Sequence, residues 1–475
     1  MRGNMKKTKI IASLGPSTSD YQVIFNMIDL GVDVFQINLN YLSFKECDDL
    51  LKKIREASLK LDKIIGIMLD IPGPSIRLDK LKEEKVFLPL NKEIRLYNYH
   101  VVCNNTQLST DYQNLVELVK LDDVIVLGAG NVKLKVIDIN ADNFICKVID
   151  AGYIESNQPV HIKGASLKLP FLNESDQKNI LYAIKNDVDF LALSYVRDEQ
   201  DILSVVDLLI ENGNDHISLI AKIENEYAYS NLEEILKVSD GVLVARGDLG
   251  LNVSIEKLPF YQKEIIKMAN RHQKIGLVST DLLKSMRGEK EPSRSEVLDI
   301  YNAVLDKVDG LVLGSETAIG ENPIACLEVM KRIIFEAENN FPYKENLEKT
   351  FAYGNKDITS TIAYSVVDAG LNLNASCILA NTMSGYTARK ISCFRPKSPI
   401  LGLSPNINTV KSLTLNYGII PVLVKKYDAT DDIIKECINK YKEIMDYKIG
   451  DIVIITGGLP LNNKNTDFMK IEKIS

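Results

Sequence analysis

The stretch VDFLALSYVRDEQDILSVVDLLIENGNDHISLIAKIENEYAYSNLEEILKVSDGVLVARGDLG, residues 188–250, decides the fold class. Three short apolar runs, Phe190–Val196, Ile217–Ile223 and Val242–Ala245, alternate with longer stretches in which apolar residues recur at helical spacing. Short apolar runs of this kind predict buried parallel strands, and the stretches between them predict amphipathic helices. The segment therefore predicts an α/β protein built from repeated strand–helix units.

The same alternation extends in both directions along the chain. Further strands are expected at Lys9–Leu14, Val32–Asn40, Ile64–Asp70, Ile275–Thr280 and Leu311–Leu313. Helices are expected at Tyr21–Leu30, Phe44–Leu61, Glu174–Asn186 and Ile324–Asn339. Eight strand–helix units in roughly 250 residues are typical of a (β/α)8 TIM barrel. The competing open, doubly wound sheet normally has a glycine-rich turn after its first strand, and none is present here.

Two segments interrupt or follow this pattern. Residues 77–164 contain short alternating runs separated by Asn, Asp and Gly, which predicts a small all-β domain inserted in the barrel. The barrel is then formed by residues 1–76 and 165–341. Residues 342–475 again alternate helices with strands, and we expect a separate C-terminal α/β domain there.

Composition excludes several classes of function. The 475-residue chain is 45% apolar and 25% charged, with a net charge of −7 and no basic stripe, so nucleic acid is not an expected partner. No apolar run approaches the roughly 18 residues of a membrane span. The seven cysteines are scattered without a CxxC pair. This favours free thiols and a reducing compartment, the cytoplasm.

Uncommon polar residues stand at the ends of the expected barrel strands. They are Asn38, Asn40, Asp70, Ser194, Lys222, Glu224, Asp248, Thr280 and Glu316. A helix N-cap or an ion pair at the rim would account for any one of them. The carboxyl ends of barrel strands converge on one mouth, however, and this is where such barrels place their chemistry. Together these residues therefore predict an active site.

Glu224 and Asp248 are the natural metal ligands of this set, because carboxylate oxygens suit Mg2+ or Mn2+. Lys222 lies two residues before Glu224, so both side chains leave a strand on the same face. An ammonium beside a divalent cation would stabilise a phosphoryl group and a developing enolate, although Lys222 could also form a simple ion pair with Glu224 or Asp70. Gly247 allows close approach of a ligand to backbone amides.

Four motifs carry a family resemblance: TKIIASLGP at 8–16, SYVR at 194–197, KIEN at 222–225 and VARGDLG at 244–250. They resemble signature motifs of the pyruvate kinase family, in which the second reads Ser-Phe-Val-Arg. The resemblance covers nearly the whole chain and includes the domain order. It implies transfer of a phosphoryl group from phosphoenolpyruvate to ADP, giving pyruvate and ATP, in a homotetramer.

The resemblance also implies roles for individual residues. Lys222 would contact the transferring phosphoryl group, and Glu224 and Asp248 would hold Mg2+ or Mn2+. The amides around Gly247 and Asp248 would bind the substrate carboxylate. Thr280 would help to protonate the enolate, although a threonine at a strand end often bonds only to backbone. Arg77, in GPSIR at 73–77, would be a further phosphate contact.

The sequence departs from the family pattern at the second and third strands. Gln36 stands in place of an arginine that contacts the phosphoryl group, and Ile71-Pro72 stands in place of Thr-Lys. A charge-assisted contact is thereby replaced by a neutral one. The family's monovalent-cation site would be left with Asn38, Asn40, Asp70 and the carbonyl of Ile71. Dependence on K+ is therefore an open question.

A loop in the C-terminal domain, Thr382 to Thr387 (TMSGYT), resembles the family's site for an effector phosphate. Thr382, Ser384, Gly385 and Thr387 would bind the phosphate of a sugar phosphate or a nucleotide. Hydroxyls and a glycine before a helix suit phosphate binding. A simple helix N-cap would explain the same residues.

Three functions remain in competition. The first is an active pyruvate kinase with altered ion requirements. The second is a catalytically weakened paralogue that binds a phosphorylated metabolite and regulates a partner, a hypothesis motivated by Gln36, Ile71 and Pro72. The third is another barrel enzyme with a magnesium enolate, such as a C–C lyase, which would lack the β insertion and the C-terminal domain.

Overall fold

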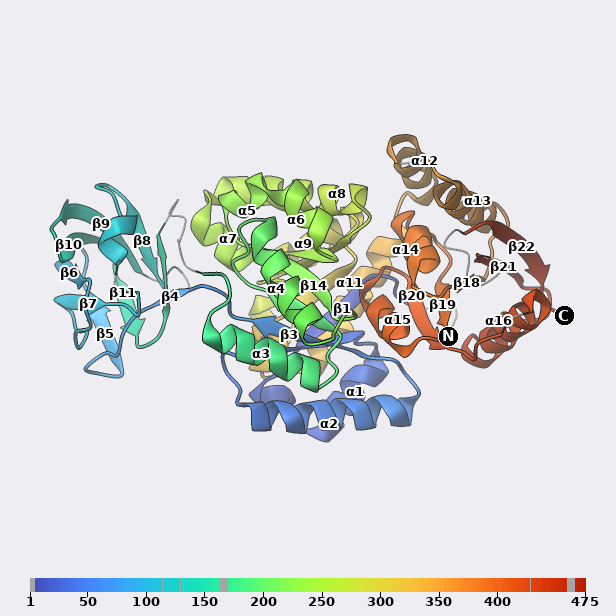
Figure 1. Ribbon diagram of the computed structural model, residues 1–475, viewed down its shortest axis with the longest axis horizontal. Coiled ribbons are helices and arrows are strands. Elements are labelled where there is room, and N and C mark those ends of the chain that lie inside the picture. The colour runs from blue at the N-terminus through green and yellow to red at the C-terminus, as the bar shows by residue number, and fades with distance from the viewer. Residues whose placement is uncertain are drawn as a thin grey trace.

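The computed structural model describes residues 5–112, 114–128, 130, 132–162, 170–354, 356–427, 429–458 and 466–475. Figure 1 shows a barrel in the middle of an elongated molecule, with a small β domain at one end and an α/β domain at the other. No helix in these ranges has the length and apolarity needed to cross a bilayer. All seven cysteines are free thiols.

The central body is a closed barrel of eight parallel strands in the order β1-β17-β16-β15-β14-β13-β3-β2. Three strands precede the insertion: β1 (Lys9–Ser13), β2 (Val34–Asn38) and β3 (Gly66–Ile71). Five follow it: β13 (Phe190–Leu193), β14 (Ser218–Ile223), β15 (Gly241–Ala245), β16 (Ile275–Ser279) and β17 (Gly310–Leu313). The predicted TIM barrel, interrupted after its third strand, is thus confirmed.

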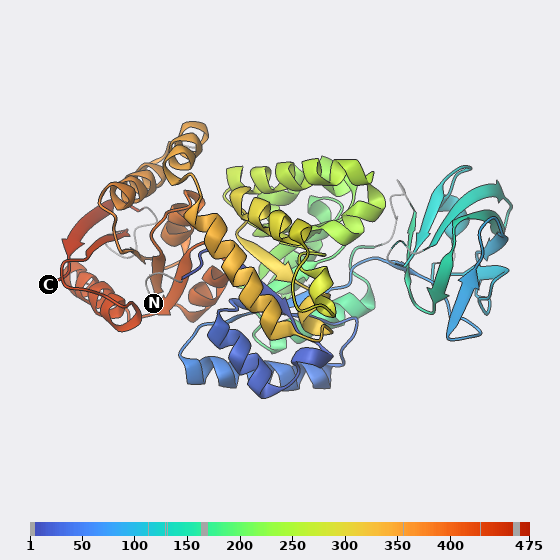
Figure 2. The ribbon, with the colours of Figure 1, turned by 180° about the vertical axis from the view of Figure 1, so that it is seen from behind.

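Helices surround the barrel because each buries one apolar stripe against the strands. They are α1 (Tyr21–Leu30), α2 (Phe44–Leu61), α3 (Glu174–Lys185), α4 (Glu199–Glu211), α5 (Glu226–Ser230), α6 (Leu232–Val238), α7 (Arg246–Asn252), α8 (Leu258–Arg271), α9 (Arg294–Leu305), α10 (Ser315–Ala318) and α11 (Pro323–Asn339). In Figure 2, α11 runs from the barrel towards the C-terminal domain.

The barrel interior is filled by apolar side chains from every strand. These are Ile11, Val34, Met68, Phe190, Ala192, Ile220, Leu243, Ala245, Ile275, Leu277 and Val312. Leu415, from the C-terminal domain, belongs to the same buried cluster. The neighbouring Thr414 lies so close to Gly66 that a Cβ there would stand 2.4 Å from its hydroxyl oxygen. The C-terminal domain therefore packs into the end of the barrel where the strands begin.

The inserted domain is joined at the other end of the barrel, after β3. Its larger sheet has the order β4-β12-β8-β9-β10-β6-β7, and a second sheet pairs β11 with β5. The strands are β4 (Ile76–Arg77), β5 (Lys85–Leu88), β6 (Glu93–Tyr97), β7 (Gln107–Ser109), β8 (Val124–Leu127), β9 (Val132–Ile139), β10 (Asn143–Asp150), β11 (Gly152–Glu155) and β12 (Pro159–Ile162). The expected boundary at 164/165 lies outside the described residues.

The C-terminal domain contains a five-stranded sheet in the order β20-β19-β18-β21-β22. Its strands are β18 (Cys377–Asn381), β19 (Ile400–Ser404), β20 (Ile419–Leu423), β21 (Ile452–Gly457) and β22 (Phe468–Lys473). Its helices are α12 (Tyr343–Tyr353), α13 (Ile358–Asn372), α14 (Tyr386–Cys393), α15 (Ile407–Ser412) and α16 (Thr430–Ile444). The antiparallel edge strand β22 was not expected, because its side chains are mostly exposed and give no apolar run.

Four barrel strands, β1, β2, β13 and β16, end earlier than the sequence predicted, and the last two are followed by unusual turns. β13 stops at Leu193 and β16 at Ser279, and the next turns place Tyr195 and Thr280 at positive φ values of 56° and 75°. Gly73 opposes the first turn with a φ of +67°, and a Cβ on Gly73 would lie 2.2 Å from the carbonyl oxygen of Ser194. Only glycine allows this approach. Gly73 therefore keeps the segment that leads into the inserted domain in contact with the turn after β13.

Replacing Gly73 with alanine should therefore destabilise the protein more than the same change elsewhere. Gly213 is the matched control, because its φ is +70° but nothing lies within 4 Å of the added Cβ. Left-handed strain alone costs about 1–2 kcal/mol. The clash at Gly73 should add about 1–3 kcal/mol. Denaturant unfolding of both variants measures the difference, and equal losses would contradict this account of Gly73.

Candidate active site

Lys222 forms the centre of the barrel mouth. Its ammonium lies 3.2 Å from Oδ1 of Asp70, 2.7 Å from Oγ of Ser194 and 3.2 Å from Oε1 of Glu224. These residues come from β3, β14 and the turns that follow β13 and β14, and the strands are neighbours in the barrel. Although burial alone would lower the pKa of Lys222, the carboxylates of Asp70, Glu224 and Asp248 raise it well above its ordinary value. Lys222 is therefore a fixed positive charge.

Glu224 is almost completely buried beside this ammonium, with 1% of its surface exposed. Its Oε2 accepts a hydrogen bond of 2.6 Å from the backbone amide of Tyr195. Burial raises the pKa of Glu224, and the charge of Lys222 opposes that rise. A buried carboxylate of this kind is costly unless cations face it.

Asp248 lies in the first turn of α7 and is partly open to solvent. Its Oδ1 accepts a hydrogen bond of 3.2 Å from the hydroxyl of Tyr195. Nε2 of His161, on strand β12 of the inserted domain, lies 4.0 Å from the same oxygen. This nitrogen is buried, and no residue in the described ranges forms a hydrogen bond with it. Burial lowers the pKa of His161, and the charge of Asp248 opposes the shift.

Sequence reasoning did not single out Tyr195 or His161 as functional residues. Tyr195 is the second residue of the SYVR motif, at a position where the pyruvate kinase family has phenylalanine. That substitution was the one available signal, since it adds a hydroxyl. His161 lies in a short β segment with no recognisable motif, and only the docking of the inserted domain brings it to the mouth.

The charges at the mouth fit a divalent cation. The carboxylates of Asp70, Glu224 and Asp248 all act on the single ammonium of Lys222, so acidic groups outnumber the ammonium in this cluster. Mg2+ commonly uses one or two carboxylates and completes its shell with water and substrate oxygens. No group of three or more His, Cys, Asp or Glu side chains within the described ranges is arranged to hold a metal. Glu224 and Asp248 remain the best pair for such a site.

At the site expected for a monovalent cation, both carboxylate oxygens of Asp70 accept hydrogen bonds from protein groups. Its Oδ2 accepts hydrogen bonds from the side-chain amides of Gln36 (3.0 Å) and Asn38 (3.2 Å). Its Oδ1 accepts from Ser194 and contacts Lys222. The carbonyl of Ile71 accepts the amide of Ser194. Protein donors thus satisfy the oxygens that a cation would use.

Asn40 lies further out than these residues. It is exposed, and its backbone amide donates to the side-chain oxygen of Asn38. It makes no contact with Asp70 in the described part of the chain. Gln36, which stands where the family has arginine, is buried and bound to Asp70.

Gly247 and Thr280 are adjacent. A Cβ on Gly247 would lie 2.9 Å from Cγ2 of Thr280, so glycine is needed for the two turns to meet. Arg246 holds this arrangement together: its Nε and Nη2 donate to the carbonyl of Thr280, and its Nη1 lies 2.5 Å from Oδ2 of Asp299. The arginine of the VARGDLG motif is therefore engaged in bracing the turn.

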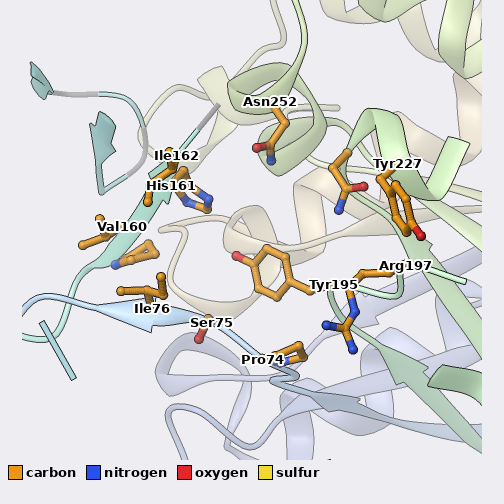
Figure 3. Close-up of a pocket in the computed structure, with 12 residues that line it drawn as sticks. Pro74, Ser75, Ile76, Val160, His161, Ile162, Tyr195, Arg197, Tyr227 and Asn252 are labelled. Carbon is orange, nitrogen blue, oxygen red and sulfur yellow. The ribbon is translucent and has the colours of Figure 1, made fainter. Parts of the chain in front are cut away.

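Arg77 lies on strand β4 of the inserted domain. Its guanidinium donates to the carbonyl of Asn157, and no contact with Lys222 occurs in the part of the chain that is described. Its charge still acts on His161 and Tyr195. A pocket of about 80 Å3 opens between the two domains here. In Figure 3, Tyr195 lies between His161 on one side and Arg197 and Tyr227 on the other.

The expected effector loop lies between β18 and α14 in the C-terminal domain. The carbonyl of Ser384 accepts a hydrogen bond of 2.6 Å from Arg389. The hydroxyl of Thr387 lies 2.7 Å from that of Thr466. Gly385 has a φ of +82° at the start of the helix, and Thr382 is buried. Of the four expected contacts, Ser384 is exposed, whereas Thr382, Gly385 and Thr387 are buried.

Comparison with known proteins identifies the family. Residues 5–327 match the model of the pyruvate kinase barrel domain, and residues 360–472 match that of the pyruvate kinase alpha/beta domain. The chain belongs to the pyruvate kinase family. Among curated relatives, the pyruvate kinase of Thermotoga maritima is 34% identical over 470 residues, which is 99% of this chain and 100% of that protein.

Other relatives agree with this assignment. The pyruvate kinase of Clostridium acetobutylicum is 31% identical over 99% of this chain and 100% of its own length. That of Bacillus licheniformis is 33% identical over 98% of this chain and 80% of its own length. A crystal structure of a pyruvate kinase from Cryptosporidium parvum superposes with a TM-score of 0.93 at 29% identity, covering 99% and 96% of the two chains. The resemblance noted in the sequence is thus confirmed.

We expect Glu224→Gln to weaken metal binding by at least about tenfold, because it would remove one of the two candidate anionic ligands. Mn2+ titration followed by electron paramagnetic resonance measures the dissociation constant without any substrate. Asp281→Asn is the control, since Asp281 is exposed near the mouth and its one ion pair among the described residues is with Lys284. Equal Mn2+ affinity in the wild type and Glu224→Gln would exclude Glu224 as a ligand.

Proposed function

We propose that this protein is a phosphotransferase that moves the phosphoryl group of phosphoenolpyruvate to ADP, giving pyruvate and ATP. The observation that carries the proposal is the Lys222 ammonium between Asp70 and Glu224, with Asp248 close by. This cluster lies at the mouth of a barrel whose sequence matches the pyruvate kinase barrel domain. Phosphoryl transfer needs positioning and charge neutralisation more than covalent catalysis, and this cluster supplies both.

The chemistry follows from where the charges lie. The bond between phosphorus and the enol oxygen breaks, and phosphorus bonds to an oxygen of the β-phosphate of ADP. Lys222 stabilises the transferring group and the enolate oxygen. The backbone amides of Gly247 and Asp248 hold the substrate carboxylate, and Thr280 helps to deliver a proton to the enolate carbon. Arg77 adds positive charge from the inserted domain.

A divalent cation, Mg2+ or Mn2+, is the cofactor that the acidic pair suits. Glu224 and Asp248 would hold it, and it would supply positive charge against phosphoryl and enolate oxygens. We infer that K+ is not required, because Gln36, Asn38, Ser194 and Lys222 already satisfy both oxygens of Asp70. The homotetramer and the cytoplasmic location stay predictions from the sequence.

The test is pyruvate formation from phosphoenolpyruvate and ADP with Mg2+ or Mn2+. Replacing K+ with choline should change the rate less than about threefold, which is under about 1 kcal/mol of barrier. Lys222→Met should lower kcat by at least about 10²-fold, since it removes the main cation facing the phosphoryl group. Lys263→Met, at an exposed ion pair with Asp306, is the matched control.

The absence of pyruvate under every ion condition would overturn the proposal. The weakened paralogue would then be favoured, because neutral Gln36 stands at the family's arginine position. That protein would still be stabilised against heat by phosphoenolpyruvate. Gln36→Arg should restore turnover if the rest of the site is intact.

We also infer that the loop of Thr382, Ser384, Gly385 and Thr387 binds the phosphate of a sugar phosphate or nucleotide effector. Its support is Ser384, an exposed residue just before α14, and the guanidinium of Arg389 in the first turn of that helix, which donates to the carbonyl of Ser384.

Glucose 6-phosphate and AMP are suitable probes of this loop, and one of them should raise the thermal midpoint of the wild type. Ser384→Asp should abolish that rise, because it adds a negative charge beside the phosphate. Gln22→Glu adds the same charge on the exposed start of α1 and should leave the rise intact. A rise that survives in Ser384→Asp would place the ligand elsewhere.

A further inference from the structure

Tyr195 contacts both carboxylates of the candidate metal site. Its backbone amide donates to Oε2 of Glu224 at 2.6 Å, and its hydroxyl donates to Oδ1 of Asp248 at 3.2 Å. The two carboxylates come from different strand ends, after β14 and after β15. A single residue from a third strand end therefore connects them.

The local backbone makes this double contact possible. Tyr195 has a φ of 56°, in the left-handed region, directly after the end of β13. Non-glycine residues seldom adopt this region, and where they do they cluster at functional sites. The turn is held on its other side by the close approach of Gly73 to the carbonyl of Ser194. In Figure 3 the ring of Tyr195 projects from this turn into the space between the barrel and the inserted domain.

Asp248 needs such a contact more than Glu224 does. The side chain of Asp248 is 34% exposed, whereas that of Glu224 is 1% exposed. A partly exposed carboxylate on a short helix can rotate, so binding a cation through it requires ordering. In the described part of the chain, the hydroxyl of Tyr195 is the one hydrogen-bond donor to its carboxylate, and the bond goes to Oδ1. His161 lies 4.0 Å from that oxygen, beyond hydrogen-bonding distance.

We propose that Tyr195 is a positioning residue of the metal site, whose hydroxyl holds Oδ1 of Asp248 and so orders the carboxylate that would bind the cation. This inference deepens the proposed function and depends on it, since Asp248 is taken as a ligand of the divalent metal. Partners that orient a ligating side chain typically contribute 10- to 100-fold to metal affinity. The pyruvate kinase motif SFVR has phenylalanine at this position, so the contact distinguishes this chain from that pattern.

The test is Tyr195→Phe, which removes the hydroxyl and restores the residue of the family motif. Mn2+ binding is measured by electron paramagnetic resonance on the full chain without phosphoenolpyruvate or ADP. The dissociation constant for Mn2+ should rise by about tenfold or more. At saturating Mn2+, kcat for pyruvate formation should fall by less than about threefold, because the chemical step itself loses little transition-state stabilisation.

Tyr227→Phe is the matched control, because Tyr227 lines the same pocket and its hydroxyl contacts neither carboxylate in the described ranges. Its Mn2+ affinity should equal that of the wild type. Unchanged or tighter Mn2+ binding by Tyr195→Phe, with the thermal midpoint preserved, would overturn the proposal. So would a large fall in kcat at saturating metal with unchanged affinity, which would place the hydroxyl in the chemical step.

The binding and activity measurements separate this inference from the proposed function. Weaker Mn2+ binding by Tyr195→Phe in a protein that makes no pyruvate would support the positioning role and reject the activity. A circular dichroism spectrum of Tyr195→Phe excludes misfolding as the cause. If that variant does not fold, 4-fluorophenylalanine at position 195 fills the place of the hydroxyl without a hydrogen-bond donor, and the Mn2+ affinity of that protein should also fall.

Discussion

The buried ammonium of Lys222 is the constraint on which the mouth of the barrel depends. Removing a charge from water is unfavourable unless opposite charges and hydrogen bonds replace the lost hydration. Asp70, Ser194 and Glu224 provide this replacement at distances of 2.7–3.2 Å. They can do so only because β3, β13 and β14 are neighbours in a closed barrel. The charge cluster of the site therefore depends on the strand order of the closed barrel.

The carboxylates that stabilise Lys222 create the opposite problem. Three acidic side chains and one ammonium leave an excess of negative charge, and Glu224 is buried with it. The negative charge of Asp70 is stabilised by hydrogen bonds from the neutral side-chain amides of Gln36 and Asn38. In the described part of the chain, Glu224 and Asp248 accept fewer hydrogen bonds than Asp70 does. Their negative charge therefore remains available to a metal ion. The neutral residue at position 36 therefore affects which of the three carboxylates attracts a cation.

Much of the fold could be predicted from the sequence, because the relevant signals are local. Apolar runs such as Phe190–Val196 and the helical spacing after them indicated eight units and the closed barrel. Lys222, Glu224 and Asp70 could be placed at one mouth because parallel strands of a barrel end on the same side. The edge strand β22 gave no such signal, since an exposed strand has no continuous apolar run.

The remaining site residues depend on tertiary contacts that no local pattern encodes. Tyr195 reaches Asp248 only because β13 ends at Leu193 and the chain turns through a left-handed residue. His161 reaches the mouth only when the inserted domain docks. Arg246 lies in the VARGDLG motif, and its side chain contacts the carbonyl of Thr280 and the carboxylate of Asp299, which are distant in sequence. For each of these residues, the sequence pattern does not reveal which distant residue its side chain contacts.

Leu415 joins the core of the barrel to the C-terminal domain. It comes from the C-terminal domain, yet it completes the apolar filling of the barrel, with Thr414 seated against Gly66. A barrel without the C-terminal domain would lack this apolar side chain at the end where the strands begin. The two domains therefore share one buried core, formed on strands whose far ends carry Asp70 and Lys222.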